Sequence, residues 1–336
     1  MRQAVTTRTA VSDRFELITV PRSRGVRSFA QDIADGLGST PKRLPSKYFY
    51  DDVGSALFDA IMRLPEYYLT RAETEILSEW GWQIVRVLDA PLDFLELGSG
   101  SAIKTRLLIG EALRVQNELC YSPIDISTEA LRASSLALVR SYSALRVRAY
   151  AGDYFDVLES HAVRLERKTL AMLMGSNIGN YEPGDAGVLL KLLGSALRPG
   201  DGLLLGADLK KDRATLELAY DDPAGVTAAF DRNLLARINR ELGANFEPRN
   251  YVHVAKYDEE RGCVDSFLES RTDAVVSVPS LALRVEIRAG ERIHTESSYK
   301  FTDAEIVQLG RHAGFRPAST WHDRAHRFSL HLLVRE

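Results

Sequence analysis

The chain has 336 residues and a mass of 37.4 kDa, a length that suggests two domains. Hydrophobic residues make up 45% and charged residues 26%, which argues against a disordered, collagen-like or coiled-coil protein. A net charge of −3 gives no electrostatic reason to expect nucleic acid or a membrane as a partner. Two distant cysteines, Cys120 and Cys263, no long apolar run and no signal-like start predict a cytoplasmic protein without disulfides, structural zinc or a membrane span.

The first 70 residues combine a helical segment with a loop that contains prolines. We predict helix in 27–39 and a loop over 40–55, which leads into residues 57–77. Aromatic residues are dense here, and such density predicts a core. Because a buried tyrosine hydroxyl needs a polar partner, these tyrosines also suit the wall of a small-molecule pocket. The aromatics are Tyr48, Phe49, Tyr50, Phe58, Tyr67 and Tyr68.

Residues 71–210 alternate between strand and helix signals. This alternation predicts parallel pairing and a doubly wound sheet. The strands are almost continuously apolar, as expected where helices cover both faces of a sheet. Strand signals occur in 91–100, 118–127, 145–156, 169–180 and 201–209, and helix signals in 101–116, 127–142 and 186–197.

The last third of the chain changes character twice. Residues 211–298 contain a helix at 231–242 and then short alternating segments, which predict an antiparallel sheet and a substrate-binding domain. Residues 299–336 return to the core with a helix, for which Thr302 and Glu305 form a capping box, and two closing strands. The predicted fold is an α/β core of 71–210 and 299–336, with an inserted α+β substrate-binding domain of 1–70 and 211–298.

A glycine turn follows the first core strand, which ends at Glu96. Gly98 and Gly100 allow a tight turn and the close approach of a ligand to the backbone. The alternative is an ordinary strand-to-helix turn. A nicotinamide dinucleotide site would have a third glycine, but Ile103 stands there and Lys104 begins the helix. The missing glycine argues against a nicotinamide-dependent oxidoreductase but leaves that alternative open.

Acidic residues also end the next two strands. Asp125 is placed to accept both hydroxyls of a ribose, although a helix N-cap role is the alternative, which Ser127 can fill instead. Asp153 is placed to accept from an adenine amino group, with Tyr154 against the ring. Acids at three successive strand ends, in a chain without a phosphate-binding loop, predict a nucleoside ligand.

This combination resembles the Rossmann-like methyltransferases that use S-adenosylmethionine. Five blocks narrow the resemblance to the histidine-specific Nα-methyltransferases, which make hercynine in ergothioneine biosynthesis. The similarity runs from about residue 40 to the end of the chain. The blocks are TPKRLPSKYFYDDVGSALFDAIMRLPEYYLTRAE, GSNIGNYEPG, LRPGDGLLLGADLKKD, AYDDPAGVTAAFDRNLLARINREL and HTESSYKF.

The resemblance implies S-adenosylmethionine as the cofactor and assigns residues to it. Gly175 matches a position near the methyl-transfer centre. The cofactor-binding residues implied in this way are Gly98, Gly100, Lys104, Asp125, Asp153 and Tyr154.

The resemblance also implies an amino-acid pocket. Asn180 and Tyr220 match the residues that hold the substrate carboxylate. Glu296, which accepts while ionised, and Ser298 match the pair that recognises the imidazole nitrogens. The remaining matches are Tyr67, which faces the imidazole, Tyr50 as a second pocket tyrosine, and Thr227 and Phe230 as wall positions.

Ser266 departs from the family, whose members carry an apolar methionine near this position. A smaller, polar side chain enlarges the ring pocket or changes its hydrogen bonding. The alternative substrate is therefore tryptophan or another aromatic amino acid.

The implied reaction is direct displacement, in which the substrate α-amine attacks the sulfonium methyl without a metal or a covalent nucleophile. Tyr50, or a water held by Asn180 and Thr227, is expected to relay the proton. The seven histidines form no ligand cluster, and only His294, two residues before Glu296, adjoins the implied site. We expect a monomer that acts on a small molecule; a non-catalytic sensor that binds S-adenosylmethionine is a further alternative.

Overall fold

The computed structural model describes residues 6–21 and 28–336. The chain forms two compact units, which are described separately. Unit 1 consists of the residues up to 24, Arg71–Leu209 and Phe301–Glu336; unit 2 consists of Gly25–Thr70 and Lys210–Lys300.

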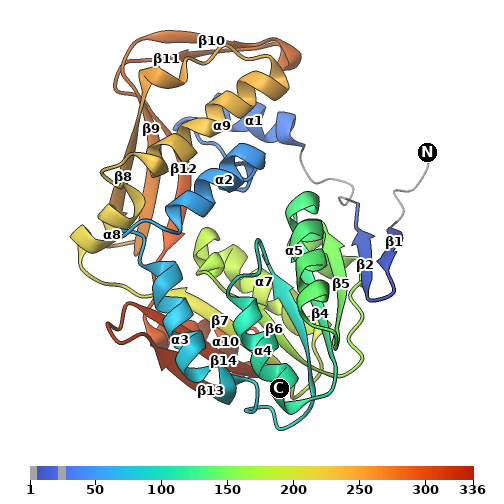
Figure 1. Ribbon diagram of the computed structural model, residues 1–336. Coiled ribbons are helices and arrows are strands. Elements are labelled where there is room, and N and C mark those ends of the chain that lie inside the picture. The colour runs from blue at the N-terminus through green and yellow to red at the C-terminus, as the bar shows by residue number, and fades with distance from the viewer. Residues whose placement is uncertain (1–5, 22–27) are drawn as a thin grey trace. The chain divides into compact units, whose positions relative to one another are not determined.

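Within the described residues, unit 1 is built on a nine-stranded sheet of order β1-β2-β5-β4-β3-β6-β7-β14-β13 (Figure 1). The six central strands, β2, β5, β4, β3, β6 and β7, run parallel to one another. At the two edges, β1 pairs antiparallel with β2, β14 with β7, and β13 with β14. The doubly wound parallel core is confirmed. The bounds are β1 Thr7–Ser12, β2 Phe15–Thr19, β3 Leu92–Leu97, β4 Leu119–Asp125, β5 Leu145–Ala151, β6 Lys168–Leu173, β7 Gly202–Asp208, β13 Phe315–His322 and β14 Phe328–Arg335.

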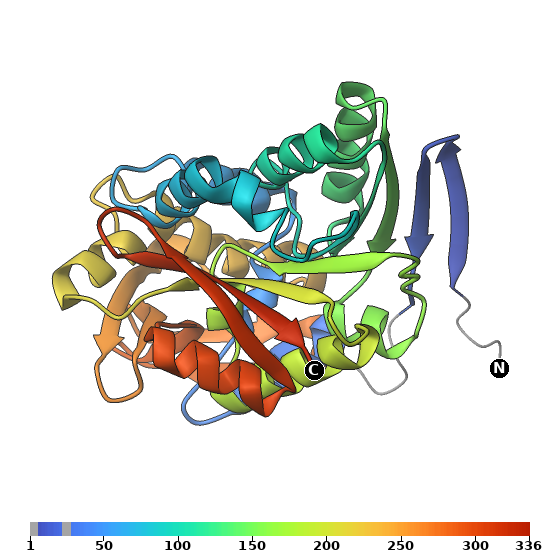
Figure 2. The same cartoon turned by 90° about the horizontal axis from the view of Figure 1, so that it is seen from below.

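Helices cover both faces of this sheet (Figure 2). One face carries α3 (Leu69–Ile84), α4 (Thr105–Val115) and α5 (Thr128–Ser141); the other carries α6 (Tyr154–Glu159), α7 (Pro183–Ala196) and α10 (Asp303–His312). Strands β3 and β7 are consequently buried at every residue. Since both faces are closed, polar side chains of the central strands reach solvent or a ligand at the strand ends.

The predicted capping box of α10 is confirmed. The Thr302 hydroxyl accepts from the backbone N–H of Glu305, and the Glu305 carboxylate accepts from the N–H of Thr302. Two donors that the first turn of the helix leaves unpaired are thereby satisfied.

Unit 2 contains a three-stranded antiparallel sheet, β12-β9-β8, and a separate hairpin, β10–β11, within the described residues (Figure 1). The antiparallel prediction for this part of the chain is confirmed. Helix α2 packs against α9, and α9 packs on β8. The bounds are α1 Phe29–Gly38, α2 Asp52–Ile61, α8 Arg213–Tyr220, α9 Val226–Leu242, β8 Tyr251–Asp258, β9 Cys263–Ser270, β10 Ala274–Val278, β11 Leu283–Ile287 and β12 Arg292–Tyr299. Short 3-10 turns are η1 Ser46–Tyr48, η3 Pro248–Asn250 and η4 Pro279–Leu281 in unit 2, and η2 Asn177–Asn180 in unit 1.

The predicted division grouped residues 1–70 with the substrate-binding domain, whereas the segment before residue 25 belongs to unit 1. Residues 1–5 and 22–27 lie outside the described residues. Strand β2 pairs parallel with β5, so β1 and β2 extend the sheet of unit 1. Arg14, in the turn between them, donates to the carbonyls of Val139 (2.8 Å), Tyr142 (2.7 Å) and Leu145 (3.2 Å). This cation lies at the C-terminal end of α5, where the helix dipole favours positive charge.

Arg14→Ala is expected to lower the free energy of unfolding by about 2 kcal/mol, because it removes charge-assisted hydrogen bonds to the last turn of α5. Urea unfolding measures the change. Arg8→Ala is the matched control, since Arg8 is exposed and its contact with Glu16 is 3.9 Å; its expected effect is below about 0.5 kcal/mol. Equal effects of the two substitutions would contradict the anchoring role of Arg14.

Candidate functional site

The glycine turn after β3 admits only glycine at its first position. Gly98 has φ +76°, and its N–H donates to the carbonyl of Ile124 at 2.8 Å. A Cβ atom there would lie 2.3 Å from the Tyr154 hydroxyl and 2.7 Å from the Asn177 side-chain nitrogen. Gly100 has φ +46° but open space around it, so its conformation, rather than a lack of room, favours glycine.

Asp125 closes this turn from the end of β4. One carboxylate oxygen accepts from the N–H of Gly100 and the other from the N–H of Ser127, each at 2.9 Å. Burial raises the pKa of Asp125, although these two backbone hydrogen bonds lower it in part. Ser127, as the sequence analysis allowed, caps α5 by accepting from Ala130. Asp125 is therefore free of the capping role, and each of its oxygens retains a lone pair for a ligand.

The other two strand-end acids have structural partners. Asp153 is the N-cap of α6 and accepts from the N–H of Phe155 at 2.9 Å, a role that the sequence analysis did not assign to it. Glu96 accepts from the hydroxyls of Thr105, at 2.8 Å, and Tyr121. Burial raises the pKa of Glu96 to about 7. Of the three acids, Glu96 thus serves the interior of the sheet.

A buried carboxylate that the sequence analysis missed ties two candidate cofactor residues together. Glu73 on α3 is fully buried, forms an ion pair with Lys104 and accepts from the N–H of Gly175 at 2.8 Å. Gly175 has φ +72°, and a Cβ atom there would lie 3.2 Å from the Lys104 nitrogen. The signal for Glu73 was its place among the buried positions Ala72 and Ile76, where a charge needs a partner.

In unit 2, the candidate aromatic residues form one continuous cluster. The Phe230 ring lies 5.7 Å from Tyr50 and 5.9 Å from Phe58 between centroids. Tyr67 continues the cluster, 6.1 Å from Phe58 and 6.4 Å from Tyr220. Most of these pairs meet edge to face, the arrangement that aromatic rings prefer. The cluster therefore brings together four candidate site residues: Tyr50, Tyr67, Tyr220 and Phe230.

Glu296 and Ser298 stand on β12 beside β9. Glu296 is paired in register with Ser266, and Ser298 with Val264. Ser266 is buried, and its side chain adjoins Glu296 across the strand pair. Burial, and to a smaller extent the Asp231 carboxylate, raise the pKa of Glu296 to about 7, although the positive charges of Lys300 and His253 oppose the rise. A raised pKa allows this carboxyl group to be protonated more readily than an ordinary glutamate, so it offers a donor as well as acceptors.

A buried ion pair connects α9, β8 and the end of α8. His253 hydrogen-bonds through one ring nitrogen to Asp231 (2.6 Å) and through the other to the carbonyl of Tyr220 (2.7 Å). Because both nitrogens face acceptors, the Asp231 carboxylate raises the pKa of His253 although burial opposes it. His253 is thus a buried packing residue whose hydrogen bond fixes the backbone of Tyr220.

Lys300 is the second group that the sequence analysis missed in unit 2. Its buried ammonium donates to the hydroxyls of Tyr220 (2.7 Å) and Ser298 (2.8 Å). The signal was a lysine at the end of a buried strand in HTESSYKF, which predicts polar partners.

The other candidates have simpler surroundings. Thr227 is buried at the start of α9, where its N–H donates to Asp222 at 2.7 Å. Asn180, which belongs to unit 1, is exposed at the end of η2. His294 hydrogen-bonds to Ser297 (3.0 Å) and Asp265 (3.3 Å), so it braces β12.

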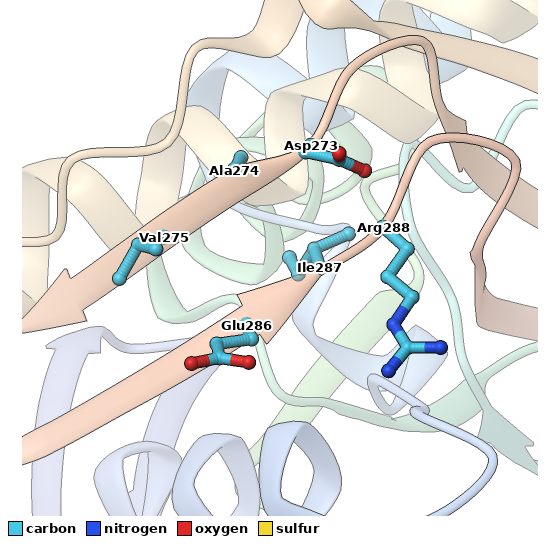
Figure 3. Close-up of a pocket in the computed structure, with 6 residues that line it drawn as sticks. All are labelled: Asp273, Ala274, Val275, Glu286, Ile287 and Arg288. Carbon is cyan, nitrogen blue, oxygen red and sulfur yellow. The ribbon is translucent and has the colours of Figure 1, made fainter.

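A surface hollow lies on the β10–β11 hairpin and contains none of the candidate residues. Asp273–Val275 and Glu286–Arg288 line it (Figure 3). Over residues 6–21 and 28–336, no helix is long and apolar enough to cross a membrane, and no three acidic, histidine or cysteine side chains gather in a way that could hold a metal ion.

Comparison with known proteins decides the family. Residues 29–335 match the family model described as histidine-specific methyltransferase, SAM-dependent. The chain belongs to this family. The histidine N-alpha-methyltransferase of Mycobacterium tuberculosis is 42% identical over 93% of this chain and 96% of its own length, and that of Mycolicibacterium smegmatis is 41% identical over 91% and 94%. Ergothioneine biosynthesis protein 1 of Neurospora crassa is 30% identical over 88% of this chain but only 33% of that protein.

Membership of the family establishes S-adenosylmethionine as the cofactor and leaves no support for a nicotinamide oxidoreductase. The turn in unit 1 fits its nucleoside part. Gly98 has no room for a Cβ atom, Gly100 keeps open space, and Asp125 offers carboxylate lone pairs beside that space. The individual cofactor contacts remain predictions.

Glu73→Ala should weaken S-adenosylmethionine binding at least tenfold and lower the free energy of unfolding by about 3 kcal/mol, because Lys104 loses its carboxylate and Gly175 its acceptor. Calorimetry and urea unfolding measure the two effects. Glu79→Ala on the same helix is the control, since Glu79 is a surface residue. An unchanged affinity for S-adenosylmethionine would show that the turn at Gly175 does not contribute to cofactor binding.

The raised pKa of His253 predicts a pH-dependent stability. A raised pKa means that the folded chain binds the proton more tightly, so the stabilisation is complete below the ordinary histidine pKa and is lost as pH rises through the raised value. The difference in unfolding free energy between wild type and His253→Gln should therefore shrink from pH 5.5 to pH 8.5. For His312→Gln, an exposed position on α10, we expect a flat difference. A His253 difference that grows with pH would refute the assignment.

Proposed function

We propose that this protein transfers methyl groups from S-adenosylmethionine to the α-amino nitrogen of L-histidine, up to Nα,Nα,Nα-trimethylhistidine (hercynine), in ergothioneine biosynthesis. The observation that carries the proposal is the hydrogen bond between Tyr220 and Ser298, with Glu296 two residues before Ser298 on the same strand. Membership of the histidine-specific family and the names of the relatives above support it.

The proposed site matches the polar atoms of histidine. An imidazole presents one N–H donor and one nitrogen acceptor. Glu296 and Ser298 are assigned to these two nitrogens, with Tyr67 against the ring. Tyr220 and Asn180 are assigned to the carboxylate, since a hydroxyl and an amide both donate. A buried site of this kind rejects substrates that leave its polar groups unpaired.

The chain contributes positioning and an apolar setting to the reaction. Bound S-adenosylmethionine supplies a methyl group that its sulfonium charge makes electrophilic. The aromatic rings of Tyr67, Tyr220 and Phe230 provide surroundings that lower the pKa of an amine and so favour its nucleophilic form. Tyr50, or a water held by Asn180 and Thr227, is assigned to relay the proton. The same ring faces suit the cationic heads produced by the second and third methyl transfers.

One observation favours a second candidate substrate. Ser266 is small and buried directly across from Glu296. A larger aromatic ring, such as the indole of tryptophan, gains room beside a serine, so methylation of another aromatic amino acid is the alternative. We further propose that the enzyme acts as a cytoplasmic monomer, consistent with its two free cysteines.

The first test supplies purified protein with S-adenosylmethionine and an equal mixture of the twenty amino acids, and follows mass changes. The expected result is a gain of three methyl groups on histidine alone. Methylation of tryptophan instead would identify tryptophan as the substrate and would point to Ser266 as the cause of the changed specificity. Cofactor binding without methylation of any amino acid would overturn the proposal in favour of a non-catalytic sensor.

Glu296→Gln tests the proposed ring contact. Because a glutamine side chain cannot exchange the donor and acceptor roles by protonation, kcat/KM for histidine should fall about tenfold to hundredfold, equivalent to ~1–3 kcal/mol. Glu286→Gln, an exposed position on β11, is the matched control and should leave kcat/KM unchanged. Equal rates for Glu296→Gln and wild type would exclude Glu296 from the ring contact.

A further inference from the structure

Three buried polar groups of unit 2 form a closed triangle. The Lys300 ammonium, in a residue only 2% exposed, lies 2.7 Å from the Tyr220 hydroxyl and 2.8 Å from the Ser298 hydroxyl. The two hydroxyl oxygens lie 2.7 Å from each other. The ammonium also lies 4.4 Å from the centre of the Tyr220 ring. A single cation therefore contacts residues assigned to opposite ends of the substrate.

The chemistry of the triangle restricts the direction of its hydrogen bonds. An ammonium carries donors only, so it occupies a lone pair on each hydroxyl oxygen and turns the hydroxyl hydrogens away from itself. A hydroxyl that accepts from a charged donor is polarised and becomes a stronger donor in turn. With Ser298 as the donor between the two hydroxyls, Tyr220 accepts from both Lys300 and Ser298, and its own hydrogen is directed to an anionic acceptor.

The charge of Lys300 acts in the same sense. Buried charges interact strongly because little solvent screens them. The positive charge opposes protonation of Glu296 and is expected to attract a carboxylate that approaches the Tyr220 hydroxyl. A neutral group in place of that carboxylate receives neither the attraction nor the strengthened hydrogen bond.

We propose that Lys300 is a positioning residue that makes the site selective for substrates with a free carboxylate. This inference rests on the proposed function, in which Tyr220 holds the substrate α-carboxylate. Lys300 acts through the Tyr220 hydroxyl, and its contact with Ser298 keeps the carboxylate and imidazole anchors in a constant relation.

The test compares L-histidine with L-histidinol, which carries a hydroxymethyl group in place of the carboxylate. Calorimetry in the presence of S-adenosylhomocysteine gives the Kd of each ligand. Lys300→Met, which keeps the length of the chain and removes the charge, should raise the Kd of histidine at least tenfold and change that of histidinol less than twofold. In assays, KM for histidine should rise while kcat changes little. Lys256→Met, an exposed position on β8, is the matched control.

A double-mutant cycle separates positioning from general support of the fold. Because Lys300 acts mainly through Tyr220, Lys300→Met should raise the histidine Kd by a much smaller factor in the Tyr220→Phe background than in the wild type. Additive losses, or equal losses for histidine and histidinol, would overturn the inference. If Lys300→Met does not fold, a comparison of Lys300→Arg with Lys300→Gln tests the same point. Only the arginine variant, which keeps the positive charge, should retain the preference for histidine over histidinol.

The same experiment distinguishes this inference from the proposed function. Wild-type protein that methylates histidine, together with a Lys300→Met variant of unchanged selectivity, would overturn only the role of Lys300. Wild-type protein that neither binds nor methylates histidine would overturn the proposed function and this inference with it.

Discussion

The closed faces of the parallel sheet govern the chemistry of unit 1. Because helices cover both faces of the sheet, a polar side chain on its central strands either finds a partner inside or emerges at a strand end. Glu96 takes the first course and Asp125 the second. The candidate cofactor residues gather at the carboxyl ends of neighbouring strands for this reason, and Glu73 reaches the same place from a helix.

Unit 2 meets the problem of buried charge in another way. Its cations and anions lie close together beneath the aromatic cluster: His253 against Asp231, and Lys300 against two hydroxyls. Such groups are costly to bury, so each is held by at least two hydrogen bonds or by an opposite charge. The result is a rigid arrangement of donors and acceptors around Tyr220, whose backbone and side chain are both fixed.

Features with a local signature were predictable from the sequence. The capping box at Thr302 and Glu305, the alternation of strands and helices, and the glycine turn are encoded within a few neighbouring residues. Glu73 and Lys300 were not predicted, because each has a partner far away along the chain: Gly175 lies 102 residues from Glu73, and Tyr220 lies 80 residues from Lys300. Sequence spacing alone does not reveal such pairs. The placement of β1 and β2 was missed for the same reason, since Arg14 bonds to residues of α5 more than 120 positions later.

The hairpin at the start of the described chain has a consequence for the protein in a crowded solution. Without it, β5 would end the sheet and present a row of unpaired backbone groups, a template on which another chain can add a strand. Strand β2 occupies that edge and buries Phe15 and Ile18, while β1 carries polar residues outward as TRTAVS. The outermost strand at this side, β1, is therefore exposed at five of its six residues and includes Thr7, Arg8, Thr9 and Ser12, a composition that disfavours the addition of another strand.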